Sequence, residues 1–596
     1  MLVASACWQD RLAASAAHVL TELVAATRRR DRRDGLATAL VWRAQVLHSL
    51  GQQARAAADV AEARSIVRSS PEMAYADNVE AFADAADGRI LESVQPENAL
   101  ACLQRAVPYF EAKLPAFLPA LRVDVARVLR ARGREGEAEA ELAAAIRQIE
   151  SQAVLAGAGQ QATFFDYAAS TPFDEMVALQ LDARDDPTRA LEYVEHSRGR
   201  QIRALLLAGR GGPGASPRRT VSASSGIAGL LAPEALQRQL PEGVALLYYV
   251  VLPDRVAAWV LSRKGSRFFR LSIDPDELEG RVAGYESAVE SGAPLPALRE
   301  EGAVLLDALV RPLLPALAGL ESLVLILDAE LQSLPFASLW DRDRRRYLVE
   351  DYRLCQAPNG SVFLHATAAA TRPGTGRTLR VLAVGNPRLA PGSGVPRLPG
   401  SALEASEVAR LYSDSELLLE AAATKRAFLE GLGQSDVVHF AGHALQGDVA
   451  GSERLLLAPD RAARTGGAVR ADEIASSALE RTRLVVLAGC RTATGTRSRF
   501  EGVRGVTRPF LAAGVPMVVA SLWDVDDAAS RAFFSEFHRQ FLAEGDAATA
   551  VRRAQLALLA GSDPVLAHPS KWAGFVSFGA LVSRGQAVAR QPQPGL

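Results

Sequence analysis

The feature that most constrains the fold is a change in the spacing of apolar residues near residue 208. Before it, Ala and Leu recur at three-to-four spacing with Arg, Glu and Gln between them, which predicts helices throughout residues 1–208. After residue 230, short apolar runs are separated by turns or by amphipathic segments, which predicts strands and helices together. The segment between them, GRGGPGASPRRTVSASSG at 209–226, predicts a flexible linker. An all-α region followed by an α/β region is therefore expected.

Two stretches of the helical region have the same pattern of small and apolar residues. Small residues let two helices approach closely, and a glycine between them would end the first helix of each pair. The pattern resembles the tetratricopeptide repeat, whose period is about 34 residues. Weaker copies centre on Ala99 and Ala190, and their loose period leaves a plain helical bundle as an alternative. The matching positions are Ala44, Leu47, Gly51, Ala56, Val60 and Ala63 in the first stretch and Ala126, Leu129, Gly133, Ala138, Leu142 and Ala145 in the second.

The α/β region begins with three consecutive strands. The segments VALLYYVVL, RVAAWVLS and RFFRLSI are joined by short turns, which predicts an antiparallel meander. From residue 377 onward, apolar runs alternate with helices, and this order is typical of a mostly parallel sheet that is covered on both faces.

The composition excludes several classes of function. The chain has 67 basic and 68 acidic side chains, so its net charge of −1 gives no electrostatic basis for binding nucleic acid or an anionic membrane. Charged residues or prolines interrupt the apolar runs before the roughly 20 residues that a membrane-spanning helix needs. The first residues lack the basic region of a secretory signal. The four cysteines lie far apart, without the spacing of a disulfide framework or a zinc site. A soluble, cytoplasmic protein without a metal or organic cofactor is expected.

Two apolar strands end at residues that can form a nucleophilic pair. The run that ends at Gly442 is followed by His443, and the run that ends at Gly489 is followed by Cys490. In open α/β sheets, residues beyond the carboxyl ends of the strands line the functional crevice, so neighbouring strands would bring His443 and Cys490 together. An imidazole can activate a thiol as a nucleophile. The alternative is a buried structural cysteine, and His439, inside the run VVHFA, is expected to be a structural histidine.

Several ordered motifs resemble the CHAT-domain peptidases, which are relatives of caspases and separase. The motifs extend over about residues 231–579 and are more specific together than any one of them is alone. The segment ALEYVEHSRGRQIRALL, before the linker, is similar to the last repeat helix of proteins that combine repeats with a CHAT domain. In the α/β region the motifs are LPFASLW, LPG at 398–400, VVHFAGHA, LVVLAGCRTATG, FEGVRGVTRPFLAAGVPMVVASLWDVDD and HPSKWAGFVSFG.

The resemblance implies a role for each matching residue. His443 would be the general base and acid, Cys490 the nucleophile, and the backbone N–H groups of Ala444 and Cys490 the oxyanion hole. The family usually has His-Gly where this chain has His443-Ala444. Asp524, in the strand-and-loop SLWDVDD, would pair with an arginine of the substrate; the alternative is that the aspartates there only cap the next helix. Glu501 matches an acidic residue of the family, and the sequence assigns it no role.

These observations predict a regulated cysteine endopeptidase that cleaves a protein, with Arg favoured before the cut. The repeats would dock a regulatory protein or complex, and the family implies proteins of bacterial defence as one setting. One alternative is an inactive caspase-like scaffold for protein interaction, and another is a hydrolase of small amides. The expected parts are helical repeats at 1–208, the linker at 209–226, a first caspase-like half at 231–370, a catalytic caspase-like α/β/α half at 376–580 and a flexible tail at 581–596.

Overall fold

The structure is a computed structural model. It describes residues 13–70, 72–73, 75–155, 162–199, 202, 230–328, 331–372, 378–390, 392–445, 453–460, 467–489 and 505–582, with the backbone alone for 153–155 and 162–170. The chain divides into two compact units, which we call the helical unit (1–193) and the α/β unit (194–596). The expected linker, most of the expected tail, Cys490 and Glu501 lie outside the described residues.

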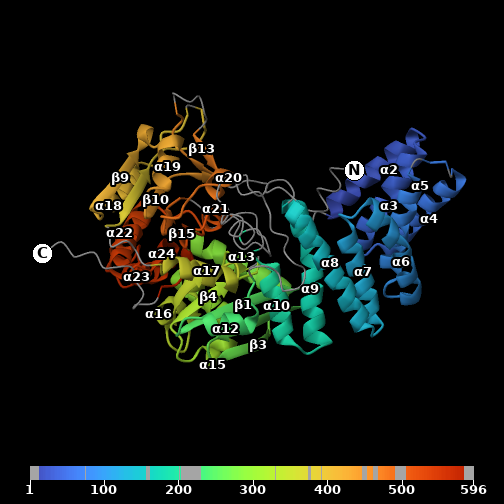
Figure 1. Cartoon of the computed structure of the whole chain (residues 1–596), viewed down its shortest axis with the longest axis horizontal. Coiled ribbons are helices and arrows are strands. Elements are labelled where there is room, and N and C mark those ends of the chain that lie inside the picture. Colours follow the sequence, from blue (N-terminus) through green and yellow to red (C-terminus); the bar gives the residue numbers. More distant parts are fainter. Residues whose placement is uncertain are drawn as a thin grey trace. The chain divides into compact units, whose positions relative to one another are not determined.

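The helical unit is a series of helices in which each, as far as Ala162–Asp182, packs against the next along the chain (Figure 1). Gly51 and Gly133 follow the first helices of the two matching pairs, with φ of 72° and 68°. Glycine adopts this left-handed conformation without steric cost, and in both places the next amide closes the helix by donating to a carbonyl five residues earlier. The predicted tetratricopeptide-like repeats are therefore confirmed. The helices are α2 (Ala13–Arg29), α3 (Arg33–Ser49), α4 (Gln53–Ser69), α5 (Ala76–Leu91), α6 (Pro96–Lys113), α7 (Leu118–Ala131), α8 (Glu135–Leu155), α9 (Ala162–Asp182) and α10 (Pro187–Ser197).

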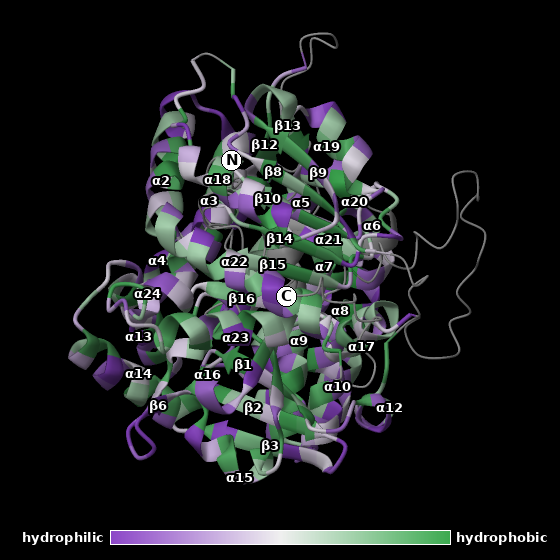
Figure 2. Ribbon diagram, turned by 90° about the vertical axis from the view of Figure 1, so that its left-hand side faces the viewer, coloured by the Kyte–Doolittle hydropathy of each residue, from purple (hydrophilic) through white to green (hydrophobic). Residues whose placement is uncertain are grey.

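One large sheet forms the centre of the α/β unit (Figure 2). Its strands follow one another in the order β3-β2-β1-β4-β7-β16-β15-β14-β10-β8-β9. Among the described residues, seven of its ten neighbouring strand pairs are parallel, and β1 to β3 form the predicted antiparallel meander. The sheet strands are β1 (Val244–Leu252), β2 (Arg255–Ser262), β3 (Gly265–Leu271), β4 (Ser322–Ile326), β7 (Arg353–Gln356), β8 (Arg380–Gly385), β9 (Asp414–Leu419), β10 (Val437–Ala441), β14 (Leu484–Leu487), β15 (Met517–Ser521) and β16 (Phe575–Gly579).

The strand β16 joins the two halves of the α/β unit. It pairs with β15 in antiparallel fashion on one side and with β7 in parallel on the other. One apolar core extends under strands from both halves. The two halves expected at 231–370 and 376–580 thus share a continuous sheet. Short strands complete the unit: β5 (Trp340–Asp341) with β6 (Arg346–Tyr347), and β11 (Ala444–Leu445) with β12 (Arg454–Leu456) and β13 (Ala468–Arg470).

Helices cover both faces of this sheet, as the alternation of side chains along β10 shows. His439 contacts α18 and α22, whereas the ring of the next residue, Phe440, packs against Phe428 of α19 on the opposite face. The expected α/β/α arrangement is therefore present. The helices are α12 (Pro233–Gln239), α13 (Pro275–Glu290), α14 (Leu295–Leu309), η1 (Arg311–Leu313), α15 (Leu314–Leu317), η3 (Phe336–Ser338), α16 (Leu348–Asp351), α17 (Gly360–Ala370), α18 (Pro399–Arg410), η4 (Glu420–Ala422), α19 (Lys425–Leu432), α20 (Ala471–Ala475), α21 (Thr507–Ala512), α22 (Asp527–Glu544), α23 (Ala547–Leu559) and α24 (Pro569–Trp572).

Within the α/β unit, which begins at Val194, a buried carboxylate attaches the end of α10 to α17. Glu195, only 1% exposed, accepts hydrogen bonds from the Gly360 and Ser361 amides at 2.9 and 2.7 Å, from the Ser361 hydroxyl and from the Tyr248 hydroxyl. The two amides belong to the first turn of α17, where a helix dipole favours negative charge. This carboxylate therefore stabilises both α10 and α17 where they meet.

A buried guanidinium lies three residues further along. Arg198, 3% exposed, donates to the carbonyls of Ile326 and Tyr249 at 2.9 and 2.5 Å and lies 3.6 Å from the Asp328 carboxylate. These carbonyls belong to the carboxyl end of β4 and to β1. Glu195 and Arg198 of the segment ALEYVEHSRGRQIRALL are therefore internal parts of the α/β unit.

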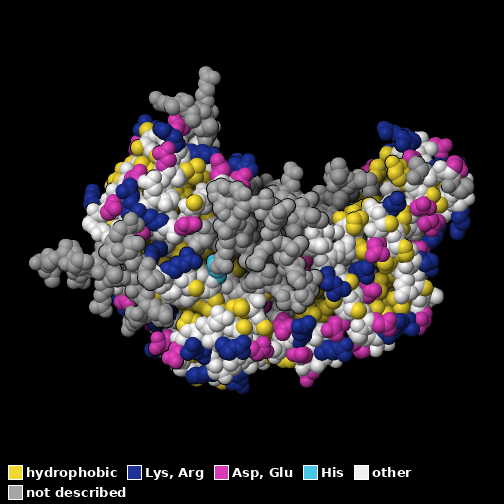
Figure 3. All heavy atoms as spheres, viewed as in Figure 1, with side chains coloured by type: hydrophobic (Ala, Val, Ile, Leu, Met, Phe, Trp, Pro, Cys, Tyr) yellow, Lys and Arg dark blue, Asp and Glu magenta, His cyan; other side chains and the backbone are white. Residues whose placement is uncertain are grey.

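Charges of both signs are interspersed over the visible surface of each unit (Figure 3). This mixture agrees with the near-zero net charge of the whole chain. In the part of the chain that the structure describes, no helix is long and apolar enough to cross a membrane.

Candidate functional site

The two strands that precede His443 and Cys490 are neighbours in the sheet. They pair in parallel with a register that places Phe440 opposite Leu487. The structure describes His443, whose side chain is half-buried. It describes the chain after the second strand only as far as Gly489, one residue before Cys490. The Gly489 carbonyl accepts a hydrogen bond from the Ser521 hydroxyl of β15 at 2.7 Å. The backbone on both sides of the candidate pair is thus held at the same end of the sheet.

The His443 ring is oriented by a backbone carbonyl that the sequence analysis did not identify. Its Nε2 lies 2.7 Å from the Pro396 carbonyl oxygen, in the loop before α18. A carbonyl oxygen only accepts hydrogen bonds, so Nε2 carries the hydrogen and the neutral ring presents Nδ1 as a proton acceptor. No side-chain motif could reveal this partner, since any residue supplies a carbonyl.

Ala444, expected in the oxyanion hole, begins β11 directly after His443. The Leu456 amide of β12 donates to the His443 carbonyl at 2.9 Å, and Ala444 pairs with Leu455. In an antiparallel pair with this pattern, the N–H of Ala444 points away from β12. Among the described residues, the non-glycine positions with positive φ do not include Ala444. Alanine in place of the family's glycine therefore causes no backbone strain here.

Gly442 is required for space and not for its backbone conformation. It is absent from the described residues with positive φ, but a Cβ at this position would lie 2.9 Å from the Phe440 ring and 3.2 Å from Cδ of Pro387. These distances are shorter than ordinary contacts. The turn after β8 can therefore pack closely beside His443 only because residue 442 has no side chain.

The three aspartates after β15 have different environments. Asp526 is the N-cap of α22: it accepts from the Ala529 amide at 3.0 Å and from the Lys571 ammonium at 2.5 Å. Burial raises the pKa of the Asp526 carboxyl, but these two donors outweigh it and the pKa is lowered. Asp527 lies against Gly400, where a Cβ would collide with its carboxylate. Asp524 is exposed and precedes the cap by two residues, so capping of α22 is the role of Asp526.

His439 belongs to a buried chain of hydrogen bonds, as expected of a structural histidine. Tyr412 Oη lies 2.8 Å from His538 Nδ1, His538 Nε2 lies 3.1 Å from His439 Nδ1, and His439 Nε2 lies 2.9 Å from Glu404. The Ser530 hydroxyl donates to the other Glu404 oxygen at 2.7 Å. An ionised Glu404 accepts hydrogen bonds from both His439 and Ser530. The Tyr412 hydroxyl and the His538 and His439 rings therefore each donate in the direction of Glu404. The arrangement fastens α18 and α22 to β10 beneath the candidate site.

The buried histidines predict a loss of stability in acid. Burial and the neighbouring His439 hold the pKa of His538 well below its ordinary value of 6.5. Between the two pKa values the unfolded chain binds more protons, so this stability is complete above pH 6.5 and falls as the pH decreases, by up to about 1.4 kcal/mol per pH unit. A His538→Gln variant should therefore lose less stability than the wild type between pH 7.5 and 5.5. Denaturant unfolding at both pH values measures this, and an unchanged difference would contradict it.

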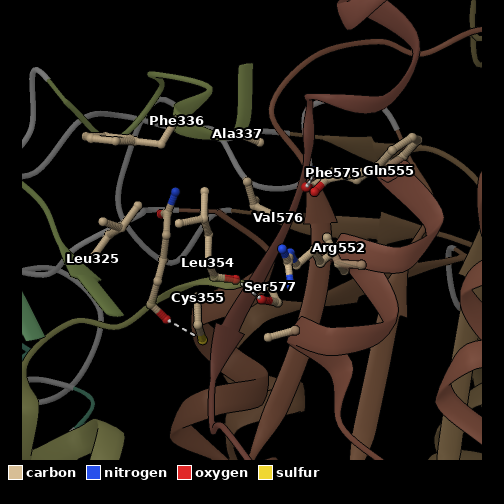
Figure 4. Close-up of a pocket in the computed structure, with 13 residues that line it drawn as sticks. Leu325, Phe336, Ala337, Leu354, Cys355, Arg552, Gln555, Phe575, Val576 and Ser577 are labelled. Carbon is tan, nitrogen blue, oxygen red and sulfur yellow. Dashed lines mark hydrogen bonds between the residues drawn. The ribbon is translucent and has the colours of Figure 1, made fainter. Parts of the chain in front are cut away.

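A second cysteine lines a small, mostly apolar pocket between the sheet and α23 (Figure 4). Cys355 is 1% exposed, and burial raises the pKa of its thiol to about 12. Its Sγ lies 3.6 Å from the Gln356 carbonyl, and the pocket walls also include Leu354, Ser577 and Gln555. A thiol with this pKa is not a nucleophile near neutral pH. In the described part of the chain, no cluster of three or more His, Cys, Asp or Glu residues can hold a metal ion.

Comparison with known proteins agrees with this architecture. Residues 299–580 match the CHAT domain family. Tetratricopeptide repeat protein 28 of Homo sapiens is 28% identical over 302 residues, which cover 44% of this chain and 12% of that protein. The corresponding protein of Mus musculus is 29% identical over 300 residues, with the same coverage. The chain thus spans only a small part of the curated relatives that it matches.

One solved structure is similar over nearly the whole chain. The Saccharomyces cerevisiae separase–securin complex at 2.6 Å resolution matches with a TM-score of 0.52 and 11% identity, over 97% of this chain and 46% of the separase chain. At this identity the similarity concerns the fold alone. It agrees with a helical region that precedes a mostly parallel sheet.

Proposed function

We propose that this chain, which carries a CHAT domain behind tetratricopeptide-like repeats, is a regulated cysteine endopeptidase that uses Cys490 and His443. The observation that carries this proposal is the register of β10 against β14, with Phe440 opposite Leu487. His443 and Cys490 each follow this pair by three residues along the chain, so each comes just after the carboxyl end of one of two neighbouring parallel strands. Side chains at such positions line one crevice, and we expect the thiol and the imidazole to meet there.

The proposed reaction follows from the orientation of His443. Nδ1 takes the thiol proton of Cys490, the thiolate sulfur bonds to the substrate carbonyl carbon, and the oxyanion is held by backbone N–H groups that include Ala444. The imidazolium then gives its proton to the leaving amine as the C–N bond breaks. Water attacks the thioester with His443 as base, and the acid product and the thiol are released. The thiol supplies the nucleophile, so these steps need no metal or organic cofactor.

The experiment that tests the proposed function maps new protein termini. A candidate substrate proteome is incubated with the wild type and with Cys490→Ala, each with and without candidate partners of the repeats. Termini that form only with the wild type support the proposal. Their absence, with a correctly folded wild type and a partner bound, would favour an inactive interaction scaffold instead.

We further propose that Asp524 recognises an arginine side chain before the cut. The geometry supports this because Asp526, not Asp524, caps the helix, while Asp524 is exposed after β15, the neighbour of β14. A guanidinium can form two charge-assisted hydrogen bonds with one carboxylate.

The specificity proposal predicts a selective loss in an Asp524→Asn variant. Charge-assisted bonds are worth about 1.5–3 kcal/mol, so kcat/KM for peptides with Arg before the cut should fall by about 10–100-fold. Peptides with Leu at that position should change little. Asp276→Asn, an exposed carboxylate on α13, is the control. Faster cleavage after Leu or Asp than after Arg by the wild type would contradict the proposal.

The helical unit offers a surface for the proposed regulatory partner. An open groove lies between α7 and α9, and its charged walls include Arg127, Arg130, Glu175 and Asp182. Arg127 and Arg130 donate to the Glu175 carboxylate at 2.6 and 3.0 Å. We propose that a protein partner docks here. A setting in bacterial defence stays a prediction from the family resemblance.

A further inference from the structure

Asn386, directly after β8, has a backbone conformation that few residues adopt. Its φ is 47°, in the left-handed region that asparagine tolerates better than most side chains. The residue is 3% exposed, and its amide donates to the Ala441 carbonyl at 3.1 Å, two residues before His443. The end of β8 is thus tied to the end of the strand that carries His443.

The Asn386 side chain closes a ring of three hydrogen bonds. Its Oδ1 accepts from the Leu398 amide at 3.0 Å, the Leu398 carbonyl accepts from the Ser401 hydroxyl at 2.8 Å, and Ser401 Oγ accepts from the Asn386 amide at 3.0 Å. Ser401 and Leu398 belong to the start of α18, twelve or more residues away along the chain. Both the N–H and the carbonyl of Leu398 are therefore fixed.

This ring holds the segment that orients the His443 ring. Pro396, whose carbonyl accepts from His443 Nε2, is two residues before Leu398. On the other side, Pro387 packs against Gly442. The surface of the same loop is tied by Glu420, which accepts from Arg388 and Arg397 at 2.6 and 2.5 Å.

The hydrogen bonds around Asn386 and the ion pairs of Glu420 hold this loop by different kinds of contact. The hydrogen bond from Arg388 lowers the pKa of the Glu420 carboxyl, but this group is exposed to solvent and its ion pairs are weak. The ring is buried at Asn386 and Ser401 and half-buried at Leu398, and it connects directly to β10. It is therefore the contact that sets the position of the Pro396 carbonyl.

We infer that Asn386 is a positioning residue of the candidate site: it locks the loop whose Pro396 carbonyl fixes the His443 tautomer with Nδ1 free to accept a proton. This inference rests on the proposed function for its catalytic consequence, and on hydrogen bonds of described residues for the lock itself. An asparagine that served only the turn would be replaced by glycine without loss, because glycine adopts the same φ. The bond from Oδ1 to Leu398 is what glycine lacks.

The test compares Asn386→Gly with Asn386→Asp in the full chain. Glycine keeps the backbone conformation and loses the acceptor, whereas aspartate keeps an acceptor at the same atom. Arg345→Gly is the matched control, since Arg345 also has a left-handed φ, of 53°, but lies on the exposed β5–β6 turn. Hydrogen exchange reports on the Leu398 amide. Nitrogen NMR of ¹⁵N-histidine-labelled protein reports which His443 ring nitrogen carries the hydrogen, with the signal assigned by its loss in His443→Gln.

In Asn386→Gly we expect the Leu398 amide to exchange at least about tenfold faster, His443 to become a mixture of tautomers, and kcat to fall about 10–100-fold with KM little changed. Asn386→Asp and Arg345→Gly should retain wild-type exchange and a single tautomer. If the Leu398 amide of Asn386→Gly exchanges at the wild-type rate and its His443 keeps a single tautomer, the inference is overturned. So would mixed tautomers in the wild type. Exchange and NMR do not depend on catalysis, so a wild type without Cys490-dependent cleavage would defeat the proposed function and leave the lock standing.

Discussion

A double variant, His443→Ala with Cys490→Ala, is expected to be no less active than either single variant. Each single change should lower kcat/KM by about 10³–10⁴-fold, because each removes one of two groups that act as a unit. Without the imidazole the thiol stays protonated near neutral pH, and without the thiol the imidazole has no nucleophile to activate. The losses should therefore not add. Single-turnover cleavage of a mapped substrate peptide by the four proteins measures this cycle.

The control for this cycle is an unchanged fold. The His443 ring is half-buried and bonds to the Pro396 carbonyl near the surface, so we expect the thermal midpoints of all four proteins to agree within a few degrees. Adding imidazole to His443→Ala should restore part of the rate if the missing group is a base. Multiplicative losses would instead mean that the two residues act independently, and the proposed pair would be wrong.

Glu195→Ala is expected to destabilise the α/β unit by about 3–5 kcal/mol. The change leaves the Gly360 and Ser361 donors and the Tyr248 hydroxyl buried without an acceptor, and each unsatisfied group costs about 1–3 kcal/mol. It also removes the negative charge at the first turn of α17. Denaturant unfolding of the full chain, followed by tryptophan fluorescence, measures the loss.

The same helix supplies a matched control. Glu192 is one turn earlier on α10, and its ion pair with Arg189 is at the surface. Glu192→Ala should cost less than about 1 kcal/mol, because surface ion pairs contribute little. Glu195→Gln keeps one acceptor oxygen and should fall between the two. If Glu195→Ala lowers the free energy of unfolding as little as Glu192→Ala does, water replaces the lost acceptor.

The sequence alone was sufficient where local pattern decides structure. Gly51 and Gly133 marked the ends of α3 and α7, and the strand pattern predicted the meander and a mostly parallel sheet. His439 was expected to be structural because it is in an apolar run. The carbonyl of Pro396 and the side-chain bond of Asn386 could not be predicted in this way. Both contacts join segments that are far apart along the chain, and a backbone acceptor can belong to any type of residue.

In the candidate site too, some features could be predicted from the sequence and others could not. The sequence left open whether the strands before His443 and Cys490 are neighbours, and the structure shows that β10 and β14 are. The pairing of His443 with Cys490 stays a prediction, because Cys490 lies outside the described residues. Asp524 was one of three aspartates that the sequence could not separate. The structure assigns the cap to Asp526, since only the fold shows which carboxylate reaches the Ala529 amide.

The central place of β16 has a consequence for synthesis of the protein. Residues 575–579 emerge from the ribosome after every other strand of the sheet, yet they fill the position between β7 and β15. Until then, each half exposes an unpaired strand edge that can bind other chains. The nascent protein thus cannot complete its sheet, or bring its two halves together, before residue 579 has been translated. For a chain proposed to cut proteins, assembly of the scaffold is in this way postponed until the last strand of its sheet has been made.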